Sequence, residues 1–159
     1  MKVLIINGSP KGKYSCTLQT SLFLEKKFPD CEYTVLHCAQ QIRKFEKDIS
    51  LLTQEIEKND LVVFSYPVYT FLCPSQLHKI IHILKENKYN FAGKFCTQIS
   101  TSKHFYDVTA HRYIQDNCQD MGMKLIKGLS ADMDDLTKEK GQKDAEEFFK
   151  YVLWCKEND

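Results

Sequence analysis

The chain has 159 residues, a length that fits one domain able to bury a core without disulfides or a structural metal. Its 22 Lys and Arg residues almost balance its 21 Asp and Glu residues, with no block of like charge, which argues against nucleic-acid binding through a basic face. The seven cysteines are scattered without a C-x-x-C pair, which argues against a disulfide framework or a metal centre and predicts reduced thiols in a cytoplasmic protein.

Strands and helices alternate along the chain. Residues 2–6 form an apolar run that ends at a turn and is too short for a signal peptide or a membrane span. Elsewhere, short apolar runs bounded by turn residues indicate strands, and apolar residues spaced by three or four indicate helices. Strands are predicted at residues 2–6, 32–36, 61–66, 94–100 and 124–126, and helices at residues 17–28, 46–58, 74–85, 108–121 and 137–156. This alternation predicts one α/β domain over residues 1–159, with a parallel sheet covered by helices on both faces.

The segment NGSPKGKYSCT, residues 7–17, connects the first predicted strand to the first predicted helix. It is not a nucleotide-binding P-loop, because Gly8 and Gly12 enclose three residues instead of four and Lys13 is followed by Tyr14. It is not a dinucleotide fingerprint either, because G-x-G-x-x-G is absent and the second strand ends at His37 rather than at an acid.

The helix start after this segment is suited to a phosphate monoester, because the first amides of a helix have no partner within it. Ser9, Ser15 and Thr17 add hydroxyl groups. Lys11 and Lys13 are either phosphate contacts at the rim or ordinary solvated lysines. The sequence therefore predicts a phosphate-binding loop.

Two segments resemble a known family. GSPKGKYSCT, residues 8–17, resembles the phosphate loop of the flavodoxin-like NADPH-dependent FMN reductases and NAD(P)H:quinone-type reductases, and SYPVYTFLCPSQLHKIIHIL, residues 65–84, resembles their second flavin loop. The chain departs from the family pattern at Lys11, where Arg is common, at Cys16, where Asn is common, and in residues 100–111, which lack the usual glycines. The resemblance implies a flavodoxin-like three-layer α/β/α sandwich with a five-stranded parallel sheet of order 2-1-3-4-5. It also implies FMN as cofactor, NAD(P)H as co-substrate and a homodimer.

In a sheet of that order, the carboxyl ends of the first and third strands lie side by side and form a ligand crevice. Residues 7–17 and 66–74 leave those two ends, and residues 100–107 leave the neighbouring one. The first loop offers phosphate donors, and the second offers aromatic rings for an isoalloxazine. The predicted cofactor-binding residues are Ser9, Lys11, Ser15, Cys16, Thr17, Leu18, Pro67, Val68, Tyr69, Thr70, Phe71, Ser100, Thr101, Ser102 and Tyr106. No residue is predicted as an obligatory acid or base, because a flavin itself carries the electrons.

Several side chains allow two interpretations. Tyr66, Tyr69 and Phe71 are consistent with flavin packing or with ordinary packing at a strand end. Cys73 is either a redox thiol or, as we expect, a small buried residue.

Residues 104–111 and 130–135 carry two further patterns. His104, Asp107 and His111 would share a helix face suited to a metal or to proton transfer, but the expected alternative is a helix start with Asp107 near its cap. The acidic run at residues 130–135 fails as a calcium loop and is predicted to be a solvated loop before the last helix.

The resemblance implies an oxidoreductase that passes hydride from a nicotinamide to bound flavin and on to a quinone, a flavin or a similar small acceptor. The alternative is a flavodoxin-type FMN carrier that docks with protein partners without nicotinamide turnover. A third interpretation is the same fold without flavin. Because a strongly acidic surface would steer a carrier to basic partners, the near-neutral charge favours the enzyme.

Overall fold

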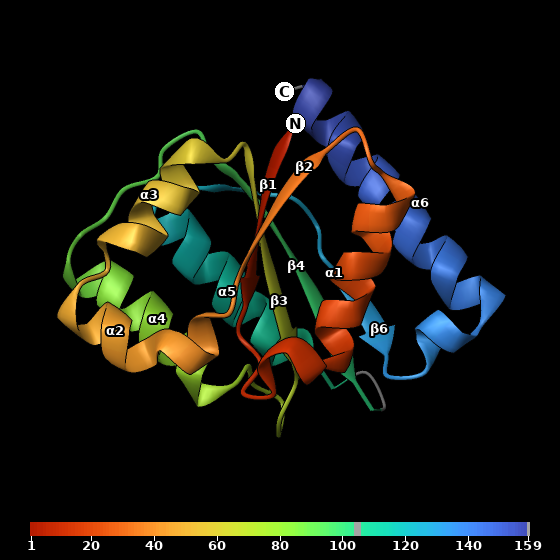
Figure 1. The fold of residues 1–159 in the computed structure, drawn as a ribbon, viewed down its shortest axis with the longest axis horizontal. Coiled ribbons are helices and arrows are strands. Elements are labelled where there is room, and N and C mark those ends of the chain that lie inside the picture. The colour runs from red at the N-terminus through yellow and green to blue at the C-terminus, as the bar shows by residue number, and fades with distance from the viewer. Residues whose placement is uncertain (104–105, 159) are drawn as a thin grey trace.

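The computed structural model of the chain describes residues 1–103 and 106–158. Its centre is a parallel sheet with the order β2-β1-β3-β4-β5, in which β6 also pairs with β4. The strands are β1 (Lys2–Asn7), β2 (Glu32–Leu36), β3 (Leu61–Pro67), β4 (Phe95–Ser102), β5 (Lys124–Leu125) and β6 (Leu129–Asp132). The predicted fold class and strand order are confirmed (Figure 1).

Helices cover both faces of the sheet (Figure 1). One face carries α1 (Cys16–Lys27) and α6 (Glu139–Glu157), and the other carries α2 (Ile42–Lys47), α3 (Ser50–Lys58), α4 (Ser75–Glu86) and α5 (Val108–Asp120). Short 3-10 helices, η1 (Gly12–Tyr14), η2 (Cys38–Gln41) and η3 (Asp135–Thr137), lie in the connections. Within the described residues, no helix combines the length and apolar character needed to cross a membrane.

The central strands contribute to two cores, because successive side chains of a strand point to opposite faces. On β1, Leu4 and Ile6 pack with residues of α3 and α4, whereas Val3 and Ile5 pack with residues of α1 and α6. Residues 61–66 of β3 are all buried. Since burying one such aliphatic side chain contributes about 1.5–3 kcal/mol, these strands form a stable base for the loops that leave them.

The helix predicted over residues 46–58 is wrong in its extent, because two helices, α2 and α3, occupy residues 42–58. The backbone at Asp48 is extended, with φ of −154°. The Asp48 carboxylate accepts a hydrogen bond from the Ser50 N–H at 2.8 Å. Aspartate competes in this way for backbone donors that a continuous helix would use, so the turn ends α2 and starts α3.

The fifth strand position also differs from the prediction. The strand is shorter than residues 124–126, and β6 follows it along the same edge of β4. The run at residues 130–135, predicted to be a loop, therefore begins as a strand, in which Ala131 pairs with Thr101 and is 4% exposed. The last helix begins at Glu139 rather than at residue 137, because η3 precedes it.

Candidate functional site

The carboxyl ends of β1, β3 and β4 lie at one edge of the sheet, at the bottom of Figure 1. The segments that follow these ends, together with a residue after β6, enclose a cavity of about 210 Å³. Its lining residues are Ser9, Lys11, Ser15, Cys16, Thr17, Pro67, Val68, Tyr69, Thr101, Ser102, Lys103 and Met133. Most of the predicted cofactor-binding residues thus lie around one cavity.

Asn7 at the end of β1 holds the first loop in shape. Its side chain is fully buried, and its Nδ2 donates a hydrogen bond to the Gly12 carbonyl at 2.9 Å. The same Nδ2 lies 3.0 Å from Nδ1 of His37, and the Asn7 Oδ1 accepts a hydrogen bond from the Ser9 N–H at 3.1 Å. The backbone at Gly12 has φ of +54°, a conformation that favours glycine.

Gln40, at the end of η2, supports the same loop from outside. Its Nε2 donates hydrogen bonds to the carbonyls of Ser9, at 3.1 Å, and Pro10, at 2.9 Å. Because these carbonyls are turned toward Gln40, the loop is fixed before a ligand arrives. Preorganisation of this kind lowers the entropy that binding must overcome.

The first turn of α1 faces the cavity with hydroxyl groups. Ser15 is the N-cap, and its Oγ accepts a hydrogen bond from the Leu18 N–H at 3.4 Å. The Thr17 hydroxyl lies 2.5 Å from the Thr101 hydroxyl of β4, which ties the helix start to the sheet. A helix N-terminus with such hydroxyl groups attracts an anion.

The charged side chains that line the cavity, among the described residues, are all positive. Lys11 and Lys103 contribute to its lining, and none of the described residues that line it is acidic. Lys13 does not line the cavity and instead lies 5.1 Å from the centre of the Tyr14 ring. The cavity is therefore suited to a negatively charged group.

Ser102, at the end of β4, has an unpaired hydroxyl. The residue is 4% exposed, it lines the cavity, and its Oγ has no hydrogen-bond partner among the described residues. An unpaired buried hydroxyl costs free energy, and native proteins usually pair such groups with protein, water or a ligand. This atom, the neighbouring hydroxyls and the lysines fit the phosphate of FMN.

The loop after β3 forms a tight turn. The backbone N–H groups of Tyr69 and Leu72 each donate to the carbonyl of the other, at 2.8 and 3.1 Å. The two residues between them have positive φ, +48° at Thr70 and +71° at Phe71. Glycine and asparagine are the usual residues in such a turn, and a β-branched threonine is strained there. Strain of this kind is concentrated at functional sites.

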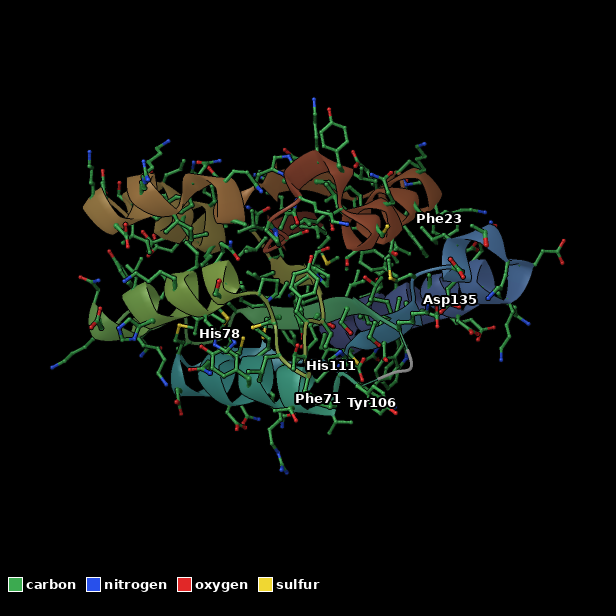
Figure 2. All side chains as sticks on the ribbon, turned by 90° about the horizontal axis from the view of Figure 1, so that it is seen from below. Phe23, Phe71, His78, Tyr106, His111 and Asp135 are labelled. Atoms are coloured by element: carbon green, nitrogen blue, oxygen red, sulfur yellow. The ribbon has the colours of Figure 1, made fainter. Side chains whose placement is uncertain are left out.

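Exposed aromatic rings stand beside this turn. Tyr69, Phe71 and Tyr106 are 45%, 53% and 60% exposed. Phe71 and Tyr106 meet edge to face with ring centres 5.5 Å apart, and Figure 2 shows the pair at the rim below β4. The Val68 N–H donates to the Thr101 carbonyl at 2.9 Å, which joins the loop to β4. A planar aromatic ligand would find matching surfaces at this rim.

Tyr66 does not belong to the rim. Its ring is fully buried, and its hydroxyl donates to Oε1 of Gln98 at 2.6 Å. Burial raises the pKa of Tyr66, so the phenol stays neutral. The packing interpretation therefore holds for Tyr66. It also holds for Cys73, which is 4% exposed and whose pKa is raised to about 12 by burial.

Asp107 and His111 form a buried polar group with Ser100 rather than part of the cavity lining. Ser100 donates to the Asp107 carboxylate at 3.0 Å and lies 2.7 Å from Nε2 of His111, which in turn is 3.4 Å from the carboxylate. Since Ser100 gives its only proton to Asp107, Nε2 of His111 acts as donor to Ser100. Burial lowers the pKa of His111, and the Asp107 charge partly opposes this.

Of the pattern at residues 104–111, the structure describes Asp107 and His111. Asp107 is the N-cap residue of α5, as expected for a helix start. His104 lies outside the described residues. Within the described part of the chain, no group of three or more His, Cys, Asp or Glu side chains is placed to hold a metal ion.

Five predicted site residues lie outside the cavity lining: Leu18, Thr70, Phe71, Ser100 and Tyr106. Leu18 packs in the core between the sheet and the helices α1 and α6, and Ser100 contacts Asp107 and His111. Met133 and Lys103 also line the cavity, although neither was predicted from the sequence. Met133 follows β6, and the strand itself was not predicted, so no sequence signal placed it here.

A family model described as NADPH-dependent FMN reductase matches residues 1–133. The structure resembles a solved NADH:FMN oxidoreductase in its apo form, with a TM-score of 0.76 and 16% identity over 94% of this chain and 87% of that one. It also resembles an FMN-dependent NADH-azoreductase from Bacillus anthracis in complex with FMN, with a TM-score of 0.67 and 14% identity over 95% and 98% of the two chains.

The flavodoxin of Pseudomonas aeruginosa, in a form with one cysteine replaced by serine, is similar as well, with a TM-score of 0.69 and 14% identity over 96% and 97% of the two chains. These likenesses confirm the flavodoxin-like fold, and at such low identities they show the fold alone. Among curated proteins, no sequence matches the chain.

Proposed function

Because the chain belongs to the family of NADPH-dependent FMN reductases, we propose that it passes electrons from NAD(P)H through FMN to a small acceptor such as a quinone or a flavin. Membership of this family identifies the chain as an FMN-dependent oxidoreductase. The whole of residues 1–159 is proposed to act as one FMN-binding domain. The observation that carries the proposal is the hydroxyl-lined cavity at the start of α1, bordered by lysines and by exposed aromatic rings.

The phosphate is proposed to lie at the N-terminus of α1. Ser15, Thr17 and Ser102 provide hydroxyl groups there, and Ser102 would gain a hydrogen bond that no described residue offers it. Lys11 and Lys103 balance the phosphate charge. These donors come from two segments, the β1–α1 connection with the first turn of α1 and the end of β4, so they would hold the phosphate from two sides.

The cavity volume indicates where the rest of the cofactor lies. Pockets that bury a whole ligand of drug size measure about 300–1,000 Å³, and this cavity of about 210 Å³ is smaller. We therefore place the phosphate and part of the ribityl chain in the cavity. Tyr69 and the edge-to-face pair of Phe71 and Tyr106 would then provide the surfaces that hold the isoalloxazine ring at the rim.

FMN, when bound, accepts a hydride from the nicotinamide and delivers the electrons to the acceptor. The protein residues position the ring and leave one side open to both substrates. Tyr69, Phe71 and Tyr106 provide apolar surface that excludes water from the ring edge. The Asp107 and His111 pair lies behind the rim and fixes the start of α5.

An anaerobic titration tests the proposal. FMN is added to the purified protein and its visible spectrum is followed, and NADPH and then NADH are added. A perturbed flavin spectrum that bleaches on nicotinamide addition is the expected result. Bound flavin that is reduced only by dithionite would support the flavodoxin-type carrier instead, and no binding would contradict both.

We further propose a homodimer that uses α6. Tyr151 and Trp154 stack on that helix with ring centres 6.3 Å apart, and they are 49% and 59% exposed in the single chain. Exposed aromatic side chains are enriched at interfaces between proteins. Sedimentation should give a dimer, and Trp154→Glu should give a monomer. A monomeric parent protein would contradict the assignment.

A further inference from the structure

Cys16 differs from the other cysteines of the chain. It is the first residue of α1 and is exposed, whereas Cys31 and Cys155 are partly buried and Cys38, Cys73, Cys96 and Cys118 are buried. Burial raises the pKa of both Cys38 and Cys73 to about 12, which makes these thiols unreactive. Reaction with a reagent in solution should therefore occur first at Cys16.

Cys16 is not only accessible but also lies at a candidate binding site. Its side chain lines the same cavity as the unpaired Ser102 hydroxyl and the two lysines, Lys11 and Lys103. Ser102 points to a ligand independently of the thiol, since its buried hydroxyl has no partner among the described residues. The lysines and the helix N-terminus favour a ligand with negative charge. A reagent that carries carboxylates would be concentrated beside the Cys16 sulfur.

We propose that Cys16 is a modification site that undergoes thiol–disulfide exchange with an anionic disulfide of low molecular weight, and that this modification competes with FMN. The proposal rests on the proposed function, because the competition requires FMN phosphate to occupy the same cavity. The carboxylates of the incoming disulfide take the place of the phosphate at the start of α1.

The reaction needs no further oxidant. The Cys16 sulfur attacks one sulfur of the disulfide, the disulfide bond of the reagent breaks, and a mixed disulfide forms at Cys16. The other half of the reagent leaves as a thiol and takes the proton that Cys16 loses. A second thiol reverses the exchange. The apoprotein is therefore blocked reversibly, and the loaded protein is protected.

Glutathione disulfide is the probe for the first experiment, read by intact mass and peptide mapping of the apoprotein. We expect one glutathionyl group, located at Cys16. Cys16→Ser should take up none, and Cys155→Ser, which removes a half-buried thiol of α6, should react like the parent protein. Absence of the adduct, or an adduct on another cysteine, would overturn the inference.

Two comparisons test the charge and the competition. Lys11→Gln should slow the reaction with glutathione disulfide about threefold to tenfold but should not slow the reaction with cystamine, a cationic disulfide that loses a repulsive charge. Saturating FMN should slow the reaction of the parent protein at least about tenfold, in line with occupancy of the cavity. An equal rate with FMN bound would overturn the competition. A failure of the proposed function would be seen in a different measurement, because the absorbance titration would then show no FMN binding.

Discussion

The threonine at position 70 adopts a backbone conformation that its side chain disfavours, with φ of +48°. Asparagine tolerates this conformation better, and it changes the entropy of the unfolded chain little. We predict that Thr70→Asn raises the free energy of unfolding of the apoprotein by about 0.5–1 kcal/mol, measured by urea denaturation. Thr109→Asn, an exchange in the first turn of α5, is the matched control and should change stability little. A loss of stability in Thr70→Asn would show that the threonine is not strained.

A substitution at Ser102 should have opposite effects on the stability of the apoprotein and on its affinity for FMN. Removing a buried hydroxyl that has no partner in the described part of the chain should stabilise the apoprotein, so Ser102→Ala should raise its free energy of unfolding by about 1 kcal/mol. The same change should weaken FMN binding about tenfold, because a hydrogen bond to a charged phosphate is lost. Denaturation and flavin titration measure the two effects. If both stability and affinity fell, the hydroxyl would have a partner in the protein itself.

At the scale of an element, the first loop depends on a side chain from η2 that does not line the cavity. Gln40→Ala removes the donors to the carbonyls of Ser9 and Pro10 and should raise the FMN dissociation constant about fivefold, because the loop loses its preorganised shape. Gln41→Ala, on the same short helix, is the control and should stay within about twofold in FMN affinity. Equal affinities in both variants would show that the loop keeps its shape without Gln40.

The start of α5 should make stability depend on pH. Burial lowers the pKa of His111 in the folded state, partly opposed by Asp107, so below the ordinary value of about 6.5 the unfolded chain binds more protons. The free energy of unfolding should therefore fall as pH falls from about 6.5 toward the lowered value. His111→Gln, which keeps a donor for Ser100, should flatten this slope. Because burial also lowers the pKa of His78, part of the slope should remain. An unchanged slope in urea denaturation would contradict the assignment.

Much of this site could be predicted from the sequence, because its main residues follow strands with strong apolar patterns. Ser15 and Thr17 lie in the segment that connects the first strand to the first helix, and the turn at Tyr69 begins just after the third strand. The supports of the loop could not be predicted. Gln40 reaches Ser9 only because β2 lies beside β1, and neither residue type nor spacing indicates that contact.

The break between α2 and α3 and the strand β6 could not be predicted from the sequence either. The break at Asp48 depends on one side-chain hydrogen bond, which competes with an otherwise good helical pattern. The strand β6 was missed because its alternation of apolar and polar side chains covers only four residues and leads into an acidic run, so its pairing with β4 is what establishes it. Met133 in the cavity lining follows from that strand.

For the whole molecule, binding of FMN should stabilise the fold, because the cavity joins loops from β1, β3 and β4. At a free FMN concentration of about 100 times the dissociation constant, the gain should be about 2.7 kcal/mol, visible as a higher melting temperature. Riboflavin lacks the phosphate and should raise the melting temperature much less at the same concentration. Equal shifts with both flavins would show that the start of α1 does not hold the phosphate.

The interrupted edge of the sheet has a consequence for behaviour at high concentration. A long unpaired edge strand is a template on which another chain can add a strand and begin to aggregate. Here the edge beside β4 consists of only two residues in β5 and four in β6. Between them Gly128 packs so closely against β4 that an added Cβ would clash with the Gln98 side chain and carbonyl. Packing therefore fixes the break between β5 and β6. A strand from another chain cannot form a continuous row of backbone hydrogen bonds along this edge of the sheet.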